Sequence, residues 1–228
     1  MLIGGFMRLV ISLLCAILLS VPSLAQTHKH MNQDKDMKIS GNGKIPAGWE
    51  FRFDHKNADL SKIQFTITGN EFHFVIGAEE AAIYYNKKDI MNGNFKCSAD
   101  FFQTKQTKHA EAFGLFWGGK DLQGNDQHYY YFLVRQDGKY LIKSRDGDNT
   151  GLIVGWTADS AVNAMDKNGQ TKNTLEVNVT GSKVNFLVNG KQVESLPVSK
   201  FKNTAGQVGL RINHHLNIDV KNFMTSKM

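Results

Sequence analysis

Aromatic rings near planar polar side chains are the residues of this chain best suited to hold a ligand. Tyr129, Tyr131 and Arg135 share one parity of a single alternating segment. Sugar rings present flat C–H patches that stack on aromatic rings, and their hydroxyls pair with planar donors and acceptors. Parity alone leaves open whether Tyr129 and Tyr131 or their neighbours Tyr130 and Phe132 face the core. The candidate ligand-binding residues are His109, Glu111, Trp117, His128, Tyr129, Tyr131, Arg135, Lys143, Trp156 and Arg211.

A second possible chemistry is the hydrolysis of a glycosidic bond. This reaction needs two carboxylates, one on each side of the bond that is cleaved. Beyond residue 25 the chain has seven Glu, and none has a carboxylate two residues away on the same strand face. Glu79 and Glu80 are adjacent, so they point to opposite faces if the chain is extended. Glu111 is the first catalytic candidate. The nucleophile-elbow, phosphate-loop and dinucleotide motifs are absent, so the residues argue against catalysis but leave an unfamiliar hydrolase open.

Two segments contain groups that could bind a metal ion. Residues 146–151 open like a calcium loop, but Thr157 stands where an EF-hand needs Glu, so we interpret them as a polar strand connection. Cleavage after Ala25 would expose Gln26, whose amine could bind Cu(II) or Ni(II) together with two amides and the imidazole of His28. A solvated polar leader is the simpler interpretation. No cofactor is therefore expected from these residues.

Alternation of apolar and polar residues predicts the elements that must position these side chains. Such alternation is typical of half-buried strands, and no stretch shows a sustained helical period. Residues 159–165 are at most one short turn of helix. The clearest alternating stretches are 49–54, 63–67, 72–76, 175–179 and 212–220.

Turn residues support an antiparallel arrangement. Asp137-Gly138 and Asn189-Gly190 separate alternating segments, and such pairs predict hairpins in which both turn residues take positive φ. A third turn is predicted at residues 180–182. Many short strands joined by tight turns indicate an all-β sandwich or barrel.

Five segments then follow one another in a specific order. GLFWGGKD (114–121) leads to HYYYFLVRQDGKYLIKSRDG (128–147) and GLIVGWTADSAVN (151–163). NTLEVNVTGSKVNFLVNGKQV (173–193) follows, and AGQVGLRINHHLNIDVKNF (205–223) closes the series. This order resembles the concanavalin A-like lectin/glucanase superfamily. It looks closest to the 3-keto-disaccharide hydrolase and laminin-G-like domain families of secreted bacterial proteins.

The resemblance implies a two-sheet antiparallel jelly-roll sandwich. It implies less about function, because this fold hosts both catalysts and binding modules. Glucanases of the superfamily carry Glu-x-Asp-x-x-Glu on one strand, and that motif is absent here. Jelly rolls of this kind often hold a structural calcium near the first and last strands. By position, Asp54 and Asp219 are the residues that could contribute to such a site.

The chain begins with the features of a secretory signal peptide. Arg8 precedes an apolar run, residues 9–19, and Ser23-Leu24-Ala25 follows as a cleavage signal. The run is too short to span a bilayer. We therefore predict a signal peptide (1–25), a polar flexible leader (26–46) and one sandwich domain (47–228). The protein is expected to be secreted or periplasmic, without membrane association after cleavage.

Composition and charge limit the classes of binding partner that the sequence suggests. The net charge of +6 comes from scattered lysines, which is no signature of nucleic-acid binding. Cys97 alternates with Phe95 and Phe101 and is expected to be a buried apolar residue. The leading hypothesis is a secreted, non-catalytic module that binds carbohydrate. The alternatives are a glycoside or 3-keto-disaccharide hydrolase and a structural or protein-interaction domain of the cell envelope.

Overall fold

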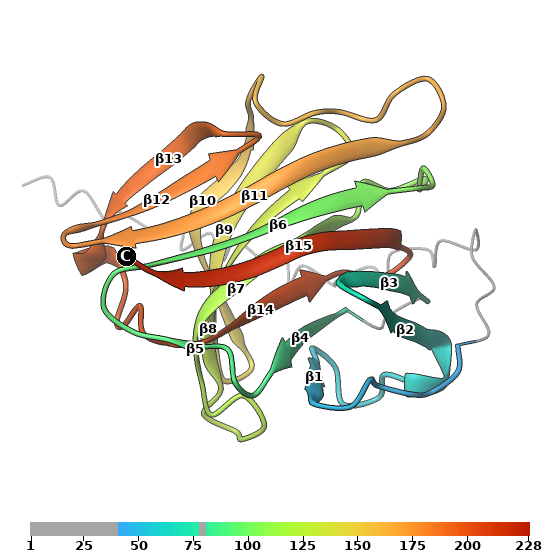
Figure 1. Cartoon of the computed structure of the whole chain (residues 1–228), viewed down its shortest axis with the longest axis horizontal. Coiled ribbons are helices and arrows are strands. Elements are labelled where there is room, and N and C mark those ends of the chain that lie inside the picture. The colour runs from blue at the N-terminus through green and yellow to red at the C-terminus, as the bar shows by residue number, and fades with distance from the viewer. Residues whose placement is uncertain (1–40, 78–80) are drawn as a thin grey trace, which may run out of the picture. The chain divides into compact units, whose positions relative to one another are not determined.

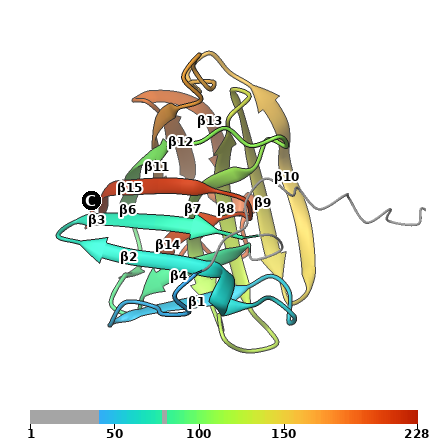
Figure 2. The same ribbon diagram turned by 90° about the vertical axis from the view of Figure 1, so that its right-hand side faces the viewer.

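The computed structural model describes residues 41–77 and 81–228, which form two antiparallel sheets packed face to face (Figures 1 and 2). In spatial order, sheet A contains β1 (Trp49–Phe53), β4 (Ala82–Asn86), β14 (Gly206–Ile212), β7 (Ala112–Lys120), β8 (His128–Arg135), β9 (Lys139–Asp146) and β10 (Asn149–Ala158), and β5 (Ile90–Met91) pairs with β14. Sheet B contains β13 (Lys191–Pro197), β12 (Lys183–Val188), β11 (Thr171–Thr180), β6 (Phe95–Gln103), β15 (Asn217–Lys227), β3 (Glu71–Ile76) and β2 (Ile63–Thr68).

The described residues contain two 3₁₀ turns, η1 (Leu60–Lys62) and η2 (Val198–Lys200), and no α-helix. Both sheets are antiparallel throughout the pairs that the structure defines. The predicted all-β, two-sheet antiparallel sandwich is confirmed. Within residues 159–165 a single turn forms at 160–162, where the backbone N–H of Ala161 donates to the Asp159 carboxylate at 2.7 Å.

The core lies between the sheets because each strand turns alternate residues inward. β11 shows this most clearly, with every second residue buried along its length. Phe101 of β6 meets Phe113 of β7 with ring centroids 5.5 Å apart, so the contact joins the two sheets. Cys97 is fully buried in this layer as predicted, and burial raises the pKa of its thiol.

Turn geometry confirms one hairpin prediction and corrects the other. Asn189 (φ 51°) and Gly190 (φ 77°) both adopt positive φ between β12 and β13. At the other hairpin only Gly138 does so, with φ 76°. Arg135 pairs with Lys139, which leaves a three-residue loop. A three-residue loop takes glycine only at its last position, so the expected two-residue turn is wrong there.

Sheet A is apolar on its outer face as well as on its core face. The alternation of β8 places Tyr130 and Phe132 in the core and Tyr129 and Tyr131 on the outer face, which answers the question that parity left open. All but the last residue of β7 are buried, so this central strand is covered on both sides. The outer cluster comprises Ile83, Tyr85, Ala112, Phe116, Leu122, Tyr129, Tyr131, Leu133 and Leu141.

The predicted signal peptide and most of the predicted leader lie outside the described residues. The last part of the leader belongs to the folded unit, since the backbone N–H of Asn42 donates to the Ile63 carbonyl at 3.1 Å. Ile45 also packs against the core. In the part of the chain that the structure describes, no helix is long and apolar enough to cross a membrane.

Candidate functional site

Five polar or aromatic residues meet over the outer side of the central strands of sheet A. They are Asp54, which follows β1, Tyr131 on β8, Lys143 and Arg145 on β9, and Arg211 on β14. We call this group the sheet A face. Antiparallel pairing sets Tyr131 opposite Lys143, and alternation turns both toward the outer side.

An ion pair between Arg211 and Asp54 forms the centre of the sheet A face. Arg211 Nη1 donates to Asp54 Oδ1 at 2.6 Å, and Nη2 donates to Oδ2. Burial alone would raise the pKa of Asp54, but the charge and hydrogen bonds of Arg211 outweigh it and hold that pKa below its ordinary value. The Arg211 guanidinium also lies 5.4 Å from the centroid of the Tyr131 ring. The pair therefore stays charged at neutral pH and has a fixed orientation.

Lys143 and Arg145 add positive charge beside this pair. Burial lowers the pKa of Lys143, and the charges of Arg211 and Arg145 lower it further against the opposing effect of Asp54. Arg145 is fixed by its own contacts, because its Nε donates to the Gly147 carbonyl at 2.7 Å. Arg145 also lies 3.6 Å from the exposed carboxylate of Asp148, so three cations gather beside two carboxylates. An excess of positive donors favours a ligand rich in hydrogen-bond acceptors.

Trp156 of β10 provides an open ring at the margin of the same sheet. The Arg135 guanidinium lies 4.2 Å from the centroid of the Trp156 ring. Asp137 fixes that guanidinium through two hydrogen bonds of 2.6 and 2.8 Å. Trp156 is 38% exposed, so one side of this stacked pair is accessible to a ligand.

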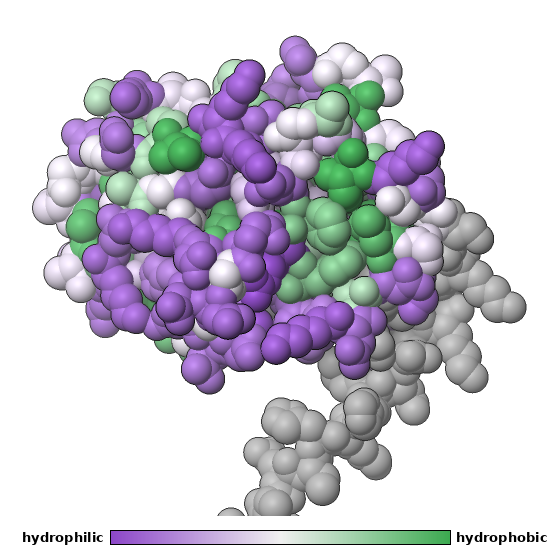
Figure 3. Space-filling view, turned by 90° about the horizontal axis from the view of Figure 1, so that it is seen from below, coloured by the Kyte–Doolittle hydropathy of each residue, from purple (hydrophilic) through white to green (hydrophobic). Residues whose placement is uncertain are grey.

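A loop between β7 and β8 lies against the other margin of the sheet A face. Arg52 donates to the carbonyls of Leu122 and Gly124 at 3.1 and 2.8 Å. Gln123 Nε2 donates to the Tyr85 hydroxyl at 2.7 Å. Figure 3 views the molecule from the β1 and β4 side and shows an apolar area bordered by hydrophilic side chains. A pocket of about 390 Å³ lies between the end of β1 and this loop, lined by Phe51, Arg52, Phe53, Asp54, His55, Lys56, Gln123 and Asp148.

Trp117 does not belong to the candidate site, although its type and segment suggested that it would. It is fully buried between the sheets and packs against Tyr130 and Phe186 at centroid distances of 5.5 and 5.3 Å. His128 also lies on the core side of sheet A, with its ring 4.8 Å from that of Tyr130. Burial lowers the pKa of His128 despite a 3.5 Å contact with Asp146. Strand parity gives the physical reason for both placements.

His109 and Glu111 precede β7 and lie away from the sheet A face. β7 begins only at Ala112, so neither residue lies on a strand. His109 is exposed, and its carbonyl accepts a hydrogen bond from the Thr107 hydroxyl. Glu111 is buried and lies 3.5 Å from His214 Nδ1.

The candidate metal ligands do not come together. Asp54 is bound to Arg211 at the sheet A face, whereas Asp219 on β15 of sheet B contacts His73 Nδ1 at 2.5 Å. The described ranges, 41–77 and 81–228, contain no group of three or more His, Cys, Asp or Glu that could hold a metal ion. Residues 146–149 form the β9–β10 hairpin, as the reading of a polar connection predicted. His28 lies outside the described residues.

Two features of the outer side of sheet A were not predicted from the sequence. Asp54 was assigned to a metal, not to Arg211, because nothing local links residues so distant in sequence. Phe116 and Tyr85 of the outer cluster, whose rings lie 6.1 Å apart, were also passed over. The available signal for Phe116 was the nearly continuous apolar run of β7, since a strand covered on both faces loses its alternation.

Comparisons with known proteins identify the fold. No protein-family model matches the chain, and no curated protein matches its sequence. Carbohydrate-binding module CBM66 from Bacillus subtilis superposes with a TM-score of 0.57 at 12% identity, covering 79% of this chain and 96% of the module. The lumenal domain of VIP36, in a calcium- and mannose-bound form, gives 0.56 at 10% identity over 84% of this chain and 88% of that domain. A B. subtilis protein of unknown function with a galectin-like fold gives 0.55 at 12%, over 78% and 89%.

These similarities show a concanavalin A-like or galectin-like β-sandwich. The fold is shared with the carbohydrate-binding module CBM66 and with the lumenal domain of VIP36. At identities of 10 to 12%, the similarity shows a shared fold and does not show a shared function.

Proposed function

We propose that this protein is a carbohydrate-binding module that holds its ligand on the sheet A face without catalysing a reaction. The observation that carries the proposal is the buried Arg211–Asp54 pair over the ring of Tyr131, with Lys143 and Arg145 beside it. Oriented donors next to aromatic rings are the elements of sugar recognition. The names of two structural neighbours, a carbohydrate-binding module and a mannose-bound lumenal domain, support the same ligand class.

Two parts of sheet A would contribute different contacts to the sugar, one by stacking and one by hydrogen bonding. Trp156, held flat against Arg135, offers an exposed ring on which the C–H face of a sugar can stack. Lys143 and Arg135, which are partly exposed, offer donors for hydroxyl oxygens. Because Asp137 holds the Arg135 guanidinium in place and Asp54 holds that of the buried Arg211 beneath the face, little rotamer freedom is lost when a sugar binds.

The ligand is expected outside the cytoplasm. The signal-peptide features of residues 1–25 support export, and the absence of cysteines other than Cys97 beyond that point suits a domain that needs no disulfide. We propose a periplasmic or secreted location and a polysaccharide met there.

A glycan array probed with the exported, purified protein tests the proposal. We expect specific binding to a small set of glycans, weakened roughly three- to tenfold in Trp156→Ala through lost stacking. Lys143→Ala should weaken it by about tenfold through a lost charge-assisted hydrogen bond. Met224→Ala is the matched control, since Met224 is 59% exposed on sheet B. An array without specific signal would contradict the proposal and favour a protein-interaction domain. Equal binding by all four proteins would show that the glycan binds elsewhere and would contradict the assignment to sheet A.

A hydrolase acting on 3-keto disaccharides is the second candidate, and one contact favours it. Glu111 and His214 Nδ1 are 3.5 Å apart, which brings a carboxylate and an imidazole together before β7. Turnover of a 3-keto-glycoside that is lost in Glu111→Gln would support this alternative. Unchanged turnover in that variant would remove Glu111 from the chemistry, and no turnover by the native protein would remove the hydrolase.

A further inference from the structure

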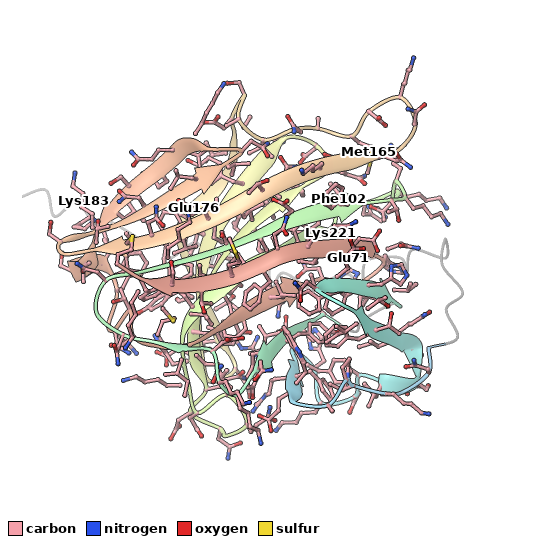
Figure 4. All side chains as sticks on the ribbon, viewed as in Figure 1. Glu71, Phe102, Met165, Glu176, Lys183 and Lys221 are labelled. Atoms are coloured by element: carbon pink, nitrogen blue, oxygen red, sulfur yellow. The ribbon has the colours of Figure 1, made fainter. Side chains whose placement is uncertain are left out.

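A second pocket opens on the opposite side of the molecule, on the outer face of sheet B. It has a volume of about 590 Å³ and lies where β6, β11 and β15 run side by side. Figure 4 shows Phe102 and Lys221 on these strands, with Met165 in the loop that precedes β11. We call it the Phe102 pocket. It is lined by Phe102, Gln103, Thr104, Asn163, Ala164, Asp166, Gln170, Thr171, Lys172, Asp219 and Lys221.

An aromatic ring lies among polar side chains in this pocket. Strand register sets Phe102 of β6 between Lys172 of β11 and Asp219 of β15, and all three turn to the outer side. The ammonium nitrogens of Lys172 and Lys221 lie 4.9 and 5.7 Å from the centroid of the Phe102 ring. A half-exposed phenyl ring between two ammonium groups is a surface for a ligand that is flat and apolar on one side and anionic at its edge.

The carboxylates of the Phe102 pocket are already occupied by donors from the protein. Asp219 Oδ1 lies 2.5 Å from His73 Nδ1. Asp166 accepts hydrogen bonds from the backbone N–H groups of Asn168 and Gln170 at 2.8 and 2.9 Å. These contacts hold both carboxylates in orientations set by donors from the protein itself.

The two lysines, in contrast, keep donors to spare. An ammonium group has three donors, and Lys221 directs one of them to Glu71 at 2.7 Å. Lys172 has only a loose contact with Asp100 at 3.8 Å. That carboxylate already accepts from the hydroxyl of Thr174 at 2.6 Å. The pocket therefore offers positive donors and calls for a ligand that supplies acceptors.

Gln103 adds an unused acceptor at the base of the pocket. Its side chain is only 1% exposed, and its Nε2 donates to the Lys105 carbonyl and to Gln136 at 2.9 and 3.0 Å. Its Oε1 has no hydrogen-bond partner in the described part of the chain. A hydroxyl from a ligand is the kind of donor that such a buried oxygen takes.

We propose that the Phe102 pocket is a second saccharide site, specific for a uronic acid. The C–H face of the sugar ring would stack on Phe102, with its carboxylate held by Lys172 and Lys221 and a hydroxyl directed toward Gln103. A uronate combines a flat apolar face, hydroxyl donors and a carboxylate at the ring edge. This site is independent of the sheet A face, so the protein would hold two saccharides on opposite sheets.

Titration of the exported protein with trigalacturonate, followed by NMR and calorimetry, tests this proposal. We expect a single additional site whose affinity falls by about tenfold or more in the double variant Lys172→Gln/Lys221→Gln. Phe102→Leu, which keeps an apolar side chain but removes the ring, should weaken binding roughly three- to tenfold. The methyl ester of the same trisaccharide, which lacks the charge, should bind at least about tenfold less tightly.

Two controls separate this site from the sheet A face and from general charge effects. Lys183→Gln removes a lysine from β12, elsewhere on sheet B, and should leave trigalacturonate binding unchanged (Figure 4). Trp156→Ala should also leave it unchanged, so this site and the proposed carbohydrate site on sheet A can fail separately. Equal loss in Lys183→Gln and the double variant, full affinity in Phe102→Leu, tight binding of the ester, or no binding at all would each overturn the proposal.

Discussion

At the scale of single residues, the ion pair of Arg211 and Asp54 decides the character of sheet A. Arg211 is 5% exposed, and a guanidinium that deep in the protein needs a counter-ion. Asp54 supplies it through two hydrogen bonds. The pair also limits the chemistry of Asp54. Arg211 holds the Asp54 carboxylate in its ionised form, which makes Asp54 a poor proton donor at neutral pH. Asp54 is therefore a positioning residue for Arg211 and not a catalytic acid.

Removal of this counter-ion gives the first prediction. Asp54→Asn should lower the free energy of unfolding by about 3 kcal/mol, because it leaves the Arg211 charge buried and unpaired. Urea unfolding at pH 7 measures the change. Asp137→Asn is the matched control, since its partner Arg135 is more exposed and an exposed ion pair is worth about 1 kcal/mol or less. Equal losses in the two variants would show that burial of the pair does not matter.

The difference in unfolding free energy between the native protein and Asp54→Asn should depend on pH in a defined direction. Folding holds the pKa of Asp54 below its ordinary value, so its stabilisation is fully present above the unfolded-state pKa of about 4. It is lost as pH falls through the still lower pKa of the folded state. The native protein should keep its advantage over Asp54→Asn between about pH 5 and 8 and lose it progressively below about pH 4. An advantage that grew on acidification would contradict the assignment.

At the scale of elements, local sequence accounts for most of what the structure shows. Alternation predicts β2, β3 and β11 because a half-buried strand repeats every two residues. The same alternation fails on β7, where both faces are covered. Turn chemistry predicts that hairpins occur but not always their length, as the three-residue loop at Gly138 shows.

The β12–β13 hairpin allows a sharp test of that turn chemistry. Gly190→Ala should lower the free energy of unfolding by about 1–2 kcal/mol, because alanine is strained at the φ of 77° that this position adopts. Gly190→Asn should lose less, since asparagine tolerates the left-handed region better. Thermal unfolding compares both with Gly155→Ala, where an added Cβ meets only Leu152 at 4.0 Å. Equal effects at residues 155 and 190 would argue against the observed turn.

At the scale of the whole molecule, two sheets give two outer faces of different character. The outer face of sheet A carries an apolar cluster beneath the Arg211–Asp54 pair. The outer face of sheet B is covered with ion pairs such as Lys221–Glu71 and Lys96–Glu176. An apolar outer face is the feature that the proposed ligand site on sheet A would use, whereas the proposed site on sheet B would use its lysines.

The contacts of Asp54 and Asp219 also predict how thermal stability responds to calcium. Because the two acidic candidates are bound to Arg211 and His73, we expect that Asp54 and Asp219 contribute no calcium-dependent stability. Thermal unfolding with excess EDTA or with calcium chloride should give the same Tm within about 1 °C, because a ligand that binds only the native state would raise it. A rise of several degrees with calcium would reveal a site that the described residues do not form. Magnesium chloride at equal ionic strength is the control.

The amino-acid sequence by itself determined the strands, the approximate turns and the fold class, because these follow from local alternation and from Gly, Asn and Asp in turns. It could not determine which residues of β7 and β8 face the core, so Trp117 of β7 was a candidate site residue although it is buried between the sheets. Nor could it pair Asp54 with Arg211, 157 residues apart, because their contact depends on the order of strands in sheet A. Strand order is set by packing between distant segments, and only the tertiary structure records it.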